Sequence, residues 1–388
     1  MLKKVFKKAI PLFMATTMAF SMSMAFAAPS NNYTLGLKEG ENGAASITIA
    51  KHLILNENAQ SPNVTFTFKL KNAAGDVANN IQPGVGFATE QTFTVAASSM
   101  SNSNGVLPAE LNGKVGEGQS YLSGSFTINF ANYFDSINFE KPGIYRYELT
   151  EVDESATHPD IVYDGVTRYV DVYVENYKQG DAYGLQVASV IMHKAGDSTY
   201  DYDTTYDAEN PRTGKNEGFV NEYKTFDLDV SKVLSGNQAN MNDEFAFTIT
   251  VDTTNNEIAK DDATYIVKVN GNAVDSLTME DGMGTLEVNL GHNDKLSIYD
   301  LPYGSEVTVT EENGKYKATY VVGAGSSTES NSWTLESLTD DVSITFTNTL
   351  EGTIPTGVFL AIGPMIIVAI IGVAGMMLAK NKKEDDDE

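Results

Sequence analysis

Short runs of alternating hydrophobic and polar residues fill most of this chain, and Gly, Asn, Asp and Pro separate them. Alternation with a period of two is typical of β-strands that bury one face. No segment before the C-terminal hydrophobic stretch keeps a helical period over three turns. We therefore predict an all-β protein with Ig-like β-sandwich domains. The predicted strands are 46–55, 63–70, 125–130, 143–151 and 167–175, followed by 225–234, 244–251, 263–269, 284–290, 305–311, 317–322 and 342–348.

The two groups of predicted strands resemble each other in order. VTFTF in the first group corresponds to FAFTI in the second, YELTE corresponds to TVTEE, and GFVNEY corresponds to TFTNTL. Such an internal echo indicates two copies of a related domain. We predict one domain over 28–224 and a second over 225–353. The first is longer, and we expect its Ser/Asn-rich insertion at 98–105 to be a loop.

Both ends of the chain carry targeting patterns. Residues 1–27 have a basic start, an apolar stretch and small residues before Ala28, as in a signal peptide. Residues 358–379 are uncharged and long enough to cross a bilayer as a helix, and three lysines follow them. We therefore expect a secreted protein whose precursor is tethered to the membrane by a transmembrane helix, with its charged tail inside.

Composition excludes several classes of function. Lys and Arg number 26 against 52 Asp and Glu, a formal net charge of −26, and no basic patch contains interleaved aromatics. Such a surface would repel nucleic acid. With no Cys and four His, no Ser/His/Asp or metal-ligand spacing stands out, so an enzyme is not favoured. Without Cys, an exported protein also needs a lock other than disulfides.

An acidic loop at 200–210 offers Asp201, Asp203 and Asp207 as candidate Ca²⁺ ligands. It lacks the glycine and the distal glutamate of a calcium loop, so a solvated loop is the better interpretation. We predict no metal and no cofactor.

Each predicted domain places polar residues where its strands should be apolar. Lys51 falls in line with Ile47, Ile49, Leu53 and Leu55 on one face of a strand. A lysine at this place recurs in the second domain, and an inward glutamate and asparagine follow in both. The two triplets are Lys51, Glu151 and Asn221, and Lys232, Glu311 and Asn348.

Any single member of these triplets has an ordinary explanation. A lysine can extend its ammonium group to water from a strand end, and a glutamate can be a turn residue just past a strand. Two parallel triplets in the same chain order favour chemistry instead. A lysine amine can attack an asparagine carboxamide, release ammonia and leave an isopeptide cross-link.

Burial supplies the conditions for this reaction. It lowers the pKa of a lysine, in extreme cases to about 6, and the neutral amine becomes a nucleophile. It raises the pKa of a glutamate, so Glu151 and Glu311 could act as proton shuttles. The core itself provides proximity, so no external enzyme is needed. Each link, Lys51–Asn221 or Lys232–Asn348, would stabilise the fold by roughly 5 kcal/mol on a chain-entropy estimate.

A short motif follows the second domain. Ile354, Pro355, Thr356 and Gly357 precede the hydrophobic span and its basic stop. This order is similar to a cell-wall sorting signal, in which a sortase cuts between Thr356 and Gly357 and passes the Thr356 carbonyl to an amine. The sorting signal is predicted to occupy 354–388.

The chain resembles the T-antigen (FctA-type) backbone pilins of Gram-positive bacteria, whose domains are CnaB-like sandwiches. The resemblance covers 45–357, and its sorting motif departs from the commoner LPxTG pattern in having isoleucine first and no spacer before Thr356. The motifs that carry it are ITIAK, KPGIYRYELTE, GFVN, DVSKVLSG, LPYGSEVTVTE, ITFTN and IPTG.

The resemblance implies that this chain is the shaft subunit of a covalent pilus anchored to the cell wall. A pilus-dedicated sortase would join Thr356 of one subunit to a lysine of the next identical subunit. Lys215 is the nearest match to the family's lysine, and Lys224 and Lys194 remain alternatives. Minor or tip pilins and peptidoglycan are the further implied partners. The competing interpretation is a wall-anchored monomeric adhesin built from the same locked domains.

Overall fold

The computed structural model of the 388-residue chain describes residues 33–76, 80–102, 107–195 and 218–352. The predicted signal peptide, the acidic loop at 200–210, Lys215 and the sorting signal from Ile354 onward lie outside these ranges. Among the described residues, no helix is both long and apolar enough to cross a membrane.

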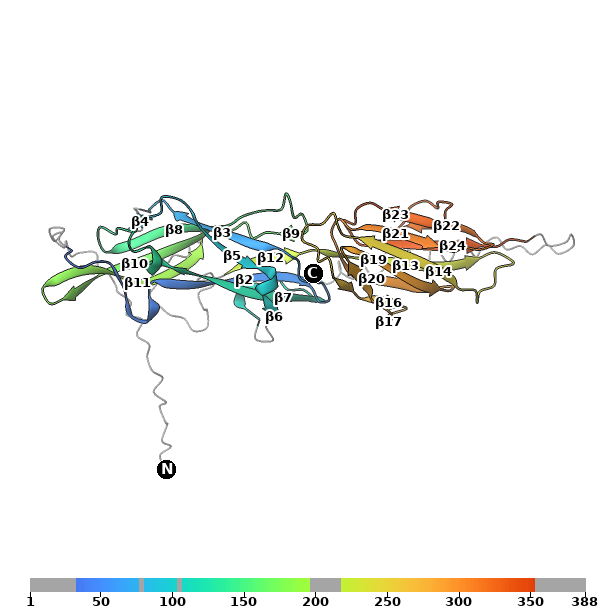
Figure 1. Ribbon diagram of the computed structural model, residues 1–388, viewed down its shortest axis with the longest axis horizontal. Helices are drawn as coiled ribbons and strands as arrows, with labels where there is room; N and C mark the ends of the chain where they lie inside the picture. The colour runs from blue at the N-terminus through green and yellow to red at the C-terminus, as the bar shows by residue number, and fades with distance from the viewer. Residues whose placement is uncertain (1–32, 77–79, 103–106, 196–217, 353–388) are drawn as a thin grey trace, which may run out of the picture.

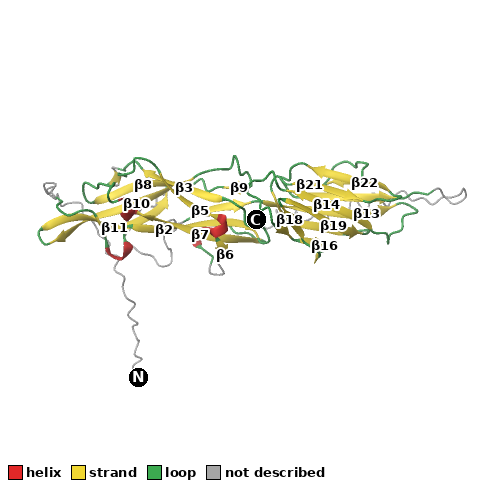
Figure 2. Cartoon of the chain, in the orientation of Figure 1, coloured by secondary structure: helices red, strands yellow, loops and turns green. Residues whose placement is uncertain are grey.

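Two β-sandwiches lie end to end and give the described chain an elongated shape (Figure 1). Nearly all regular structure is strand, as the alternating pattern predicted, and the helical pieces in the described ranges are 3-10 turns of three or four residues (Figure 2). The all-β prediction with two tandem sandwiches is therefore confirmed.

The first sandwich consists of two sheets. One has the strand order β1-β11-β10-β8-β3-β5, with β4 beside β8, and the other has the order β6-β7-β2-β12-β9. The strands of the first sheet are β1 (Lys38–Glu39), β3 (Thr65–Asn72), β4 (Ile81–Pro83), β5 (Gln91–Ala96), β8 (Gly143–Glu151), β10 (Arg168–Gln179) and β11 (Ala182–Lys194). Those of the second are β2 (Ser46–Asn56), β6 (Ser101–Asn102), β7 (Gln119–Asn129), β9 (Ile161–Val162) and β12 (Phe219–Tyr223).

The second sandwich also consists of two sheets. Their strand orders are β17-β16-β20-β13-β24-β22 and β15-β18-β19-β14-β21-β23. The strands of its first sheet are β13 (Thr225–Ser235), β16 (Val267–Val269), β17 (Asn272–Ala273), β20 (Lys295–Pro302), β22 (Lys317–Val322) and β24 (Val342–Thr349). Those of its second are β14 (Phe245–Asp252), β15 (Thr264–Tyr265), β18 (Leu277–Glu280), β19 (Met283–Leu290), β21 (Glu306–Glu311) and β23 (Ser332–Leu335).

In each sandwich, a long early strand pairs in parallel with the closing strand of the same sheet. β2 pairs with β12, and Lys51 lies opposite Phe219 in the register. β13 pairs with β24, and Lys232 lies opposite Phe346. Most other strand pairs are antiparallel. These two parallel pairs place a strand from the beginning of each sandwich beside the strand that ends it.

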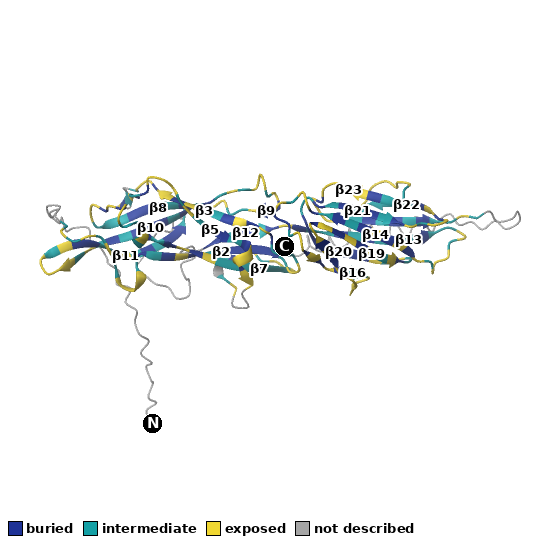
Figure 3. Cartoon of the chain, viewed as in Figure 1, coloured by how far each residue is buried: buried dark blue, intermediate teal, exposed yellow. Residues whose placement is uncertain are grey.

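Apolar residues from facing sheets fill each sandwich, and burial follows the alternation of the strands (Figure 3). Strand β14 shows this pattern clearly: Phe245, Phe247, Ile249 and Val251 are buried between exposed or partly exposed neighbours. This burial of alternate side chains explains why the sequence folds as paired layers.

Several elements differ from the sequence expectation. The insertion at 98–105 was expected to be a loop, yet its described part contains residues of a 3-10 turn (Ala97–Ser99) and strand β6, which pairs with β7. The predicted strand at 263–269 is divided into β15 and β16. Strands β11 and β20 were not predicted at all, although each is long and well paired.

Candidate functional site

Two buried clusters have the same construction, one in each sandwich. The lysine comes from the early strand, β2 or β13, and the asparagine from its parallel partner, β12 or β24. Each asparagine lies two positions beyond the residue opposite the lysine, so the two side chains are diagonal neighbours on the inner face. The glutamate comes from the facing sheet, on β8 or β21.

In the first cluster, a carboxylate joins amine and amide. Lys51 Nζ lies 2.9 Å from Oε1 and 3.0 Å from Oε2 of Glu151. Asn221 Nδ2 donates to the same Oε1 at 2.8 Å. Lys51 is 0% exposed and Asn221 is 1% exposed. The three predicted residues are therefore in contact through one oxygen atom and shielded from water.

The second cluster repeats these contacts. Lys232 Nζ lies 2.5 Å from Glu311 Oε1, and Asn348 Nδ2 donates to that oxygen at 2.7 Å. All three side chains are fully buried. Lys232 Nζ and Glu311 are close enough for an ion pair, although the geometry does not qualify as a hydrogen bond.

Aromatic rings cover both amines in the same way. Lys51 Nζ lies 4.5 Å from the centre of the Phe66 ring and 5.9 Å from that of Phe68. Lys232 Nζ lies at the same two distances from Phe245 and Phe247. The VTFTF and FAFTI motifs thus supply equivalent apolar walls.

Burial changes the protonation of each pair. It lowers the pKa of Lys51 and that of Lys232 to about 8, against the opposing attraction of the adjacent glutamate. It raises the pKa of Glu151 and of Glu311, again against the effect of the lysine. Both shifts favour a neutral amine beside a protonated carboxyl group, which are the forms that a nucleophile and a general acid need.

The first cluster has contacts that sequence reasoning missed. The Asn221 carbonyl oxygen accepts a hydrogen bond from the Asp164 backbone N–H at 2.8 Å, and a buried Arg168 holds the Asp164 carboxylate. In the described part of the chain, the Asn348 carbonyl oxygen has no hydrogen-bond partner. Asp164 carries no signal in the strand pattern, because it lies in the segment before β10. Arg168 begins β10 in line with the buried Val170 and Val172, so the alternation that revealed Lys51 could have revealed it too.

A further buried polar group lies on the outer face of β2. His52 Nδ1 is 2.8 Å from Ser123 Oγ, and His52 Nε2 is 3.0 Å from Glu110 Oε1. The residue types resemble a hydrolase triad, but Glu110 lies within the turn Ala109–Leu111, and Ser123 lines neither of the two surface pockets described below. The contacts fasten this turn over the sheet.

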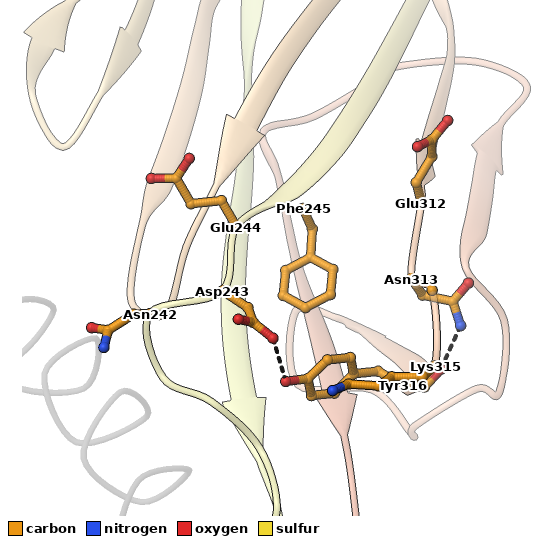
Figure 4. A pocket seen from close by; sticks show the side chains of 9 residues that line it. Asn242, Asp243, Glu244, Phe245, Glu312, Asn313, Lys315 and Tyr316 are labelled. Atoms are coloured by element: carbon orange, nitrogen blue, oxygen red, sulfur yellow. Dashed lines mark hydrogen bonds between the residues drawn. The ribbon is translucent and has the colours of Figure 1, made fainter.

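Two surface pockets adjoin the clusters. One of about 430 Å³ reaches Asn221 and Arg168. The other, of about 520 Å³, is shown in Figure 4: the Phe245 ring lines it, and Tyr316 donates to Asp243 Oδ2 at 2.7 Å across it. Within the described ranges, no group of three or more His, Asp or Glu could hold a metal ion.

The predicted polymerisation residues are only partly placed. Lys215 and the motif Ile354 to Gly357 lie outside the described residues. Of the alternatives, Lys224 is exposed in the connection between β12 and β13, and Lys194 ends β11 partly buried. The described chain stops at Gly352, whose backbone N–H donates to Asn237 at 2.8 Å.

Comparisons with known proteins match both sandwiches. Residues 47–224 match the family described as Spy0128-like isopeptide containing domain, and residues 226–350 match a domain of unknown function (DUF7601). A curated protein from Streptococcus pyogenes serotype M1, named pilin, is 27% identical over 357 residues, which cover 88% of this chain and 92% of that protein.

Solved structures share the fold. The major pilin from Streptococcus pyogenes superposes with a TM-score of 0.58 at 23% identity, covering 80% of this chain and 99% of that one. The major pilin T3.2 from Streptococcus pyogenes serotype GAS13637 gives 0.53 at 21% identity, covering 79% of this chain and 98% of that one. At these identities the likeness establishes the arrangement of the two sandwiches.

Proposed function

We infer that this chain is the shaft subunit of a surface pilus, because residues 47–224 belong to the Spy0128-like isopeptide containing domain family and the chain aligns with a pilin over most of both lengths. The all-β tandem fold agrees with that of the major pilins. A subunit of this kind is a structural protein rather than an enzyme.

We propose that each buried cluster forms an isopeptide bond without external catalysis. The neutral amine of Lys51 attacks Cγ of Asn221, and a new C–N bond forms. The protonated Glu151 delivers its proton to Nδ2 of Asn221, the C–Nδ2 bond breaks, and ammonia leaves. The resulting Glu151 carboxylate takes up the proton that the attacking nitrogen loses. Lys232, Glu311 and Asn348 undergo the same exchange. No oxidant or cofactor is consumed.

The observation that carries this proposal is the duplicated geometry. Two clusters that are far apart in the sequence share the same register offset, the same shared carboxylate oxygen and the same two ring distances. Ordinary buried ion pairs have no reason to include an asparagine at an equivalent position in both copies. Such pairs also contribute little stability by themselves.

Assembly would use the residues at the two ends. We propose that residues 1–27 direct export, that a pilus-dedicated sortase cuts after Thr356, and that Lys215 of the next subunit receives the Thr356 carbonyl. Minor or tip pilins would join the same polymer, and peptidoglycan would receive its base. The precursor would remain tethered by residues 358–379 until the sortase acts.

Wall extracts of the producing strain test this assignment. A shaft subunit should give a ladder of multimers that survives boiling in detergent, and Lys215→Ala should reduce it to one band. Lys178→Ala, which removes an exposed lysine of β10, is the matched control and should leave the ladder intact. A single band in the unmutated strain would favour the monomeric adhesin, and a ladder that survives Lys215→Ala would favour Lys224 or Lys194.

A further inference from the structure

The two clusters differ at the amide oxygen that takes up negative charge when the lysine amine attacks the amide carbon. In the first cluster, Asn221 Oδ1 accepts a hydrogen bond from the Asp164 backbone N–H at 2.8 Å. In the second, Asn348 Oδ1 is buried without a hydrogen-bond partner among the described residues. The carboxyl groups differ as well, because Lys51 donates to Glu151 Oε2 whereas Glu311 Oε2 has no hydrogen-bond partner in the described chain. Only the difference at the amide oxygen bears on activation of the carbonyl.

Sheet topology accounts for the difference. β12 has β9 as its outer neighbour, and β9 ends at Val162, so the chain beyond it is free to turn its backbone toward Asn221. The equivalent strand β24 has β22 beside it, and Ala318 lies opposite Asn348 in that regular ladder. A ladder amide bonds to the backbone and does not reach a neighbouring side chain.

A buried ion pair fixes the turn that presents this N–H. Arg168 Nη1 and Nη2 donate to Oδ1 and Oδ2 of Asp164 at 2.7 and 2.8 Å. Asp164 Oδ2 also accepts from the Val220 backbone N–H at 3.0 Å, which ties the turn to the residue next to Asn221. Arg168 Nη2 donates to the Gly218 carbonyl at 2.7 Å, at the start of β12.

The pair is unusually well enclosed. Arg168 is 2% exposed, and its guanidinium lies 4.0 Å from the centre of the Phe219 ring. Burial raises the pKa of Asp164, but the hydrogen bonds and charge of Arg168 outweigh it, and the pKa lies below its ordinary value. The carboxylate therefore stays charged and bonded at neutral pH. The pair thus binds the backbone of both Gly218 and Val220, just before Asn221, and can fix the position of the turn relative to that residue.

We propose that the Asp164–Arg168 pair is a positioning unit that holds the Asp164 backbone N–H against the Asn221 carbonyl, where it polarises the amide for attack by Lys51 and stabilises the oxyanion that follows. The inference rests on the cross-linking proposed above. As Lys51 Nζ bonds to Cγ, the carbonyl electron pair moves onto Oδ1, and a donor at 2.8 Å is within the range that stabilises such an oxygen. The electron pair on Oδ1 returns and re-forms the C=O bond as ammonia leaves.

Two matched pairs of variants test this role in the full-length chain, purified unfolded and uncross-linked and then refolded by dilution into detergent. Aliquots are quenched over time, digested, and the two cross-linked peptides quantified by mass spectrometry. Asp164→Ala and Asp164→Pro both lose the carboxylate, but only the proline loses the N–H. We expect the first bond to form about 100-fold more slowly in the proline variant than in the unmutated chain, as for loss of one oxyanion donor. The alanine variant keeps the N–H without the pair that holds it, and its rate should be intermediate.

Arg168→Lys and Arg146→Lys form the second pair. Each breaks a buried arginine–aspartate pair of the first sandwich, but Arg146 lies on the face of β8 opposite to Glu151 and so away from the first cluster. Arg168→Lys should slow the first bond between about 10- and 100-fold, since small misplacements of reacting groups have effects of this size. Arg146→Lys should leave the rate within about twofold. The second bond, in the same molecules, should keep its rate throughout.

The pH profile separates activation of the carbonyl from loosening of the fold. If the N–H acts on the carbonyl, Asp164→Pro lowers the plateau rate while the midpoint set by the Lys51 amine equals that of Asp164→Ala. A loosened core would rehydrate the amine and move the midpoint upward. Hydrogen exchange of the β2 amides shows whether each variant folds. If Asp164→Pro does not fold, the comparison of Arg168→Lys with Arg146→Lys tests the positioning role.

Formation of the first bond at the unmutated rate in Asp164→Pro, or equal slowing by Arg146→Lys and Arg168→Lys, would overturn the positioning role. Absence of both cross-linked peptides from the unmutated chain would instead overturn the proposed cross-linking itself. The two failures are therefore distinguishable in one experiment.

Discussion

A lysine side chain is costly to bury as a cation, and Lys51 and Lys232 are both completely buried. The glutamate beside each amine reduces that cost, and the pKa of each lysine still falls to about 8. An unlinked cluster is thus a source of instability that disappears once the amine becomes an amide. Burial of the lysine amine therefore both promotes the reaction and destabilises the fold until the bond has formed.

Removing one glutamate should abolish one bond. Glu151→Ala leaves Lys51 without a proton acceptor and should prevent the first bond, while the second still forms. The intact mass of the mature chain should then fall short of the sequence mass by one ammonia. The cost in unfolding free energy should be roughly 5 kcal/mol, the contribution of a link that closes a loop of this size.

Glu148→Ala is the matched control for this variant. Glu148 lies on the same strand but on the opposite face, where its carboxylate pairs with Lys71 at 2.9 Å. It should leave both bonds intact. Formation of the first bond in Glu151→Ala would rule out the proton shuttle.

The free lysine should reveal itself in the pH dependence of stability. In Asn221→Ala the bond cannot form, and Lys51 titrates near 8 in the folded chain against 10.5 in the unfolded chain. The unfolded chain binds more protons in this window, so stability should rise by roughly 3 kcal/mol as the pH increases from about 8 to about 10.5. Below about 8 the full penalty remains.

Denaturant unfolding at several pH values measures this effect. The linked, unmutated chain has no free Lys51 amine and should lack the rise in stability that its titration causes. The tyrosines titrate in both proteins and contribute equally to the two pH dependences. Identical pH slopes for Asn221→Ala and the unmutated chain would contradict a free buried amine in the variant.

Strand alternation was sufficient to find the six cluster residues, because a lysine, glutamate or asparagine among apolar residues on one strand face can be recognised in the sequence alone. Asp164 could not be found in this way, whereas Arg168, in line with the apolar Val170 and Val172, was overlooked. Their contacts depend on the segment after β9 lying beside β12, which no local pattern specifies.

At the scale of elements, the parallel pairs β2–β12 and β13–β24 create the sites. In each pair the asparagine lies two positions beyond the residue opposite the lysine, so both groups face the core as diagonal neighbours. A slip of one residue would turn the asparagine to the outside. The register of these strands is therefore as important as the identity of the side chains.

Gly218 tests the first register. A Cβ at this position would lie 2.3 Å from the Ala50 carbonyl oxygen, which belongs to the β2 backbone and cannot move aside locally. Gly218→Ala should push β12 away from β2, destabilise the chain by about 1–3 kcal/mol and lower the fraction of first cross-link. Peptide mass spectrometry measures that fraction.

Gly165→Ala provides the comparison, since nothing lies within 4 Å of a Cβ at that position. It should form both bonds normally. Full cross-linking in Gly218→Ala at the unmutated rate would show that the close approach of the two strands is dispensable.

Strands with regular alternation were predicted well, whereas others were missed for identifiable reasons. In β20 the apolar and polar residues alternate only from Leu296 to Ile298, and Asp300, which has a positive φ of 62°, interrupts the run. β11 contains a register shift opposite Tyr173 and Val174, which breaks the period of two. The predicted strand 263–269 is divided at Ile266 because the pairing partner changes there: β15 pairs with β18, whereas β16 pairs with β20.

At the scale of the whole molecule, the two sandwiches are joined by side chains as well as by the chain. Ile258 of the second sandwich is 2% exposed and packs with the core of the first, and its carbonyl accepts from the Asn63 N–H at 2.7 Å. Asn56 donates to Asp300 at 2.8 Å across the same junction. Sequence patterns within either domain give no indication of these contacts.

Ile258→Ala should loosen this junction without affecting either bond. The loss of buried side-chain volume should weaken the interdomain contact by about 2–5 kcal/mol. Small-angle X-ray scattering should then show a wider distribution of maximum dimensions. Ile266→Ala, at an exposed position, is the control, and an unchanged distribution for Ile258→Ala would mean that the chain connection alone fixes the two sandwiches.

With both links in place, tension would take a short route through the molecule. It would enter at Lys51, cross to Asn221, follow the chain to Lys232 and leave through Asn348. The bodies of both sandwiches would be bypassed, so the subunit could bear force without disulfides, which the absence of Cys forbids.

The intact mass of the folded, mature chain tests the central claim most directly. Each bond releases one ammonia, so an account with two self-formed links predicts a mass below the sequence mass by two ammonia, with Lys51 joined to Asn221 and Lys232 joined to Asn348 in the digested peptides. A mass equal to that of the sequence would contradict it.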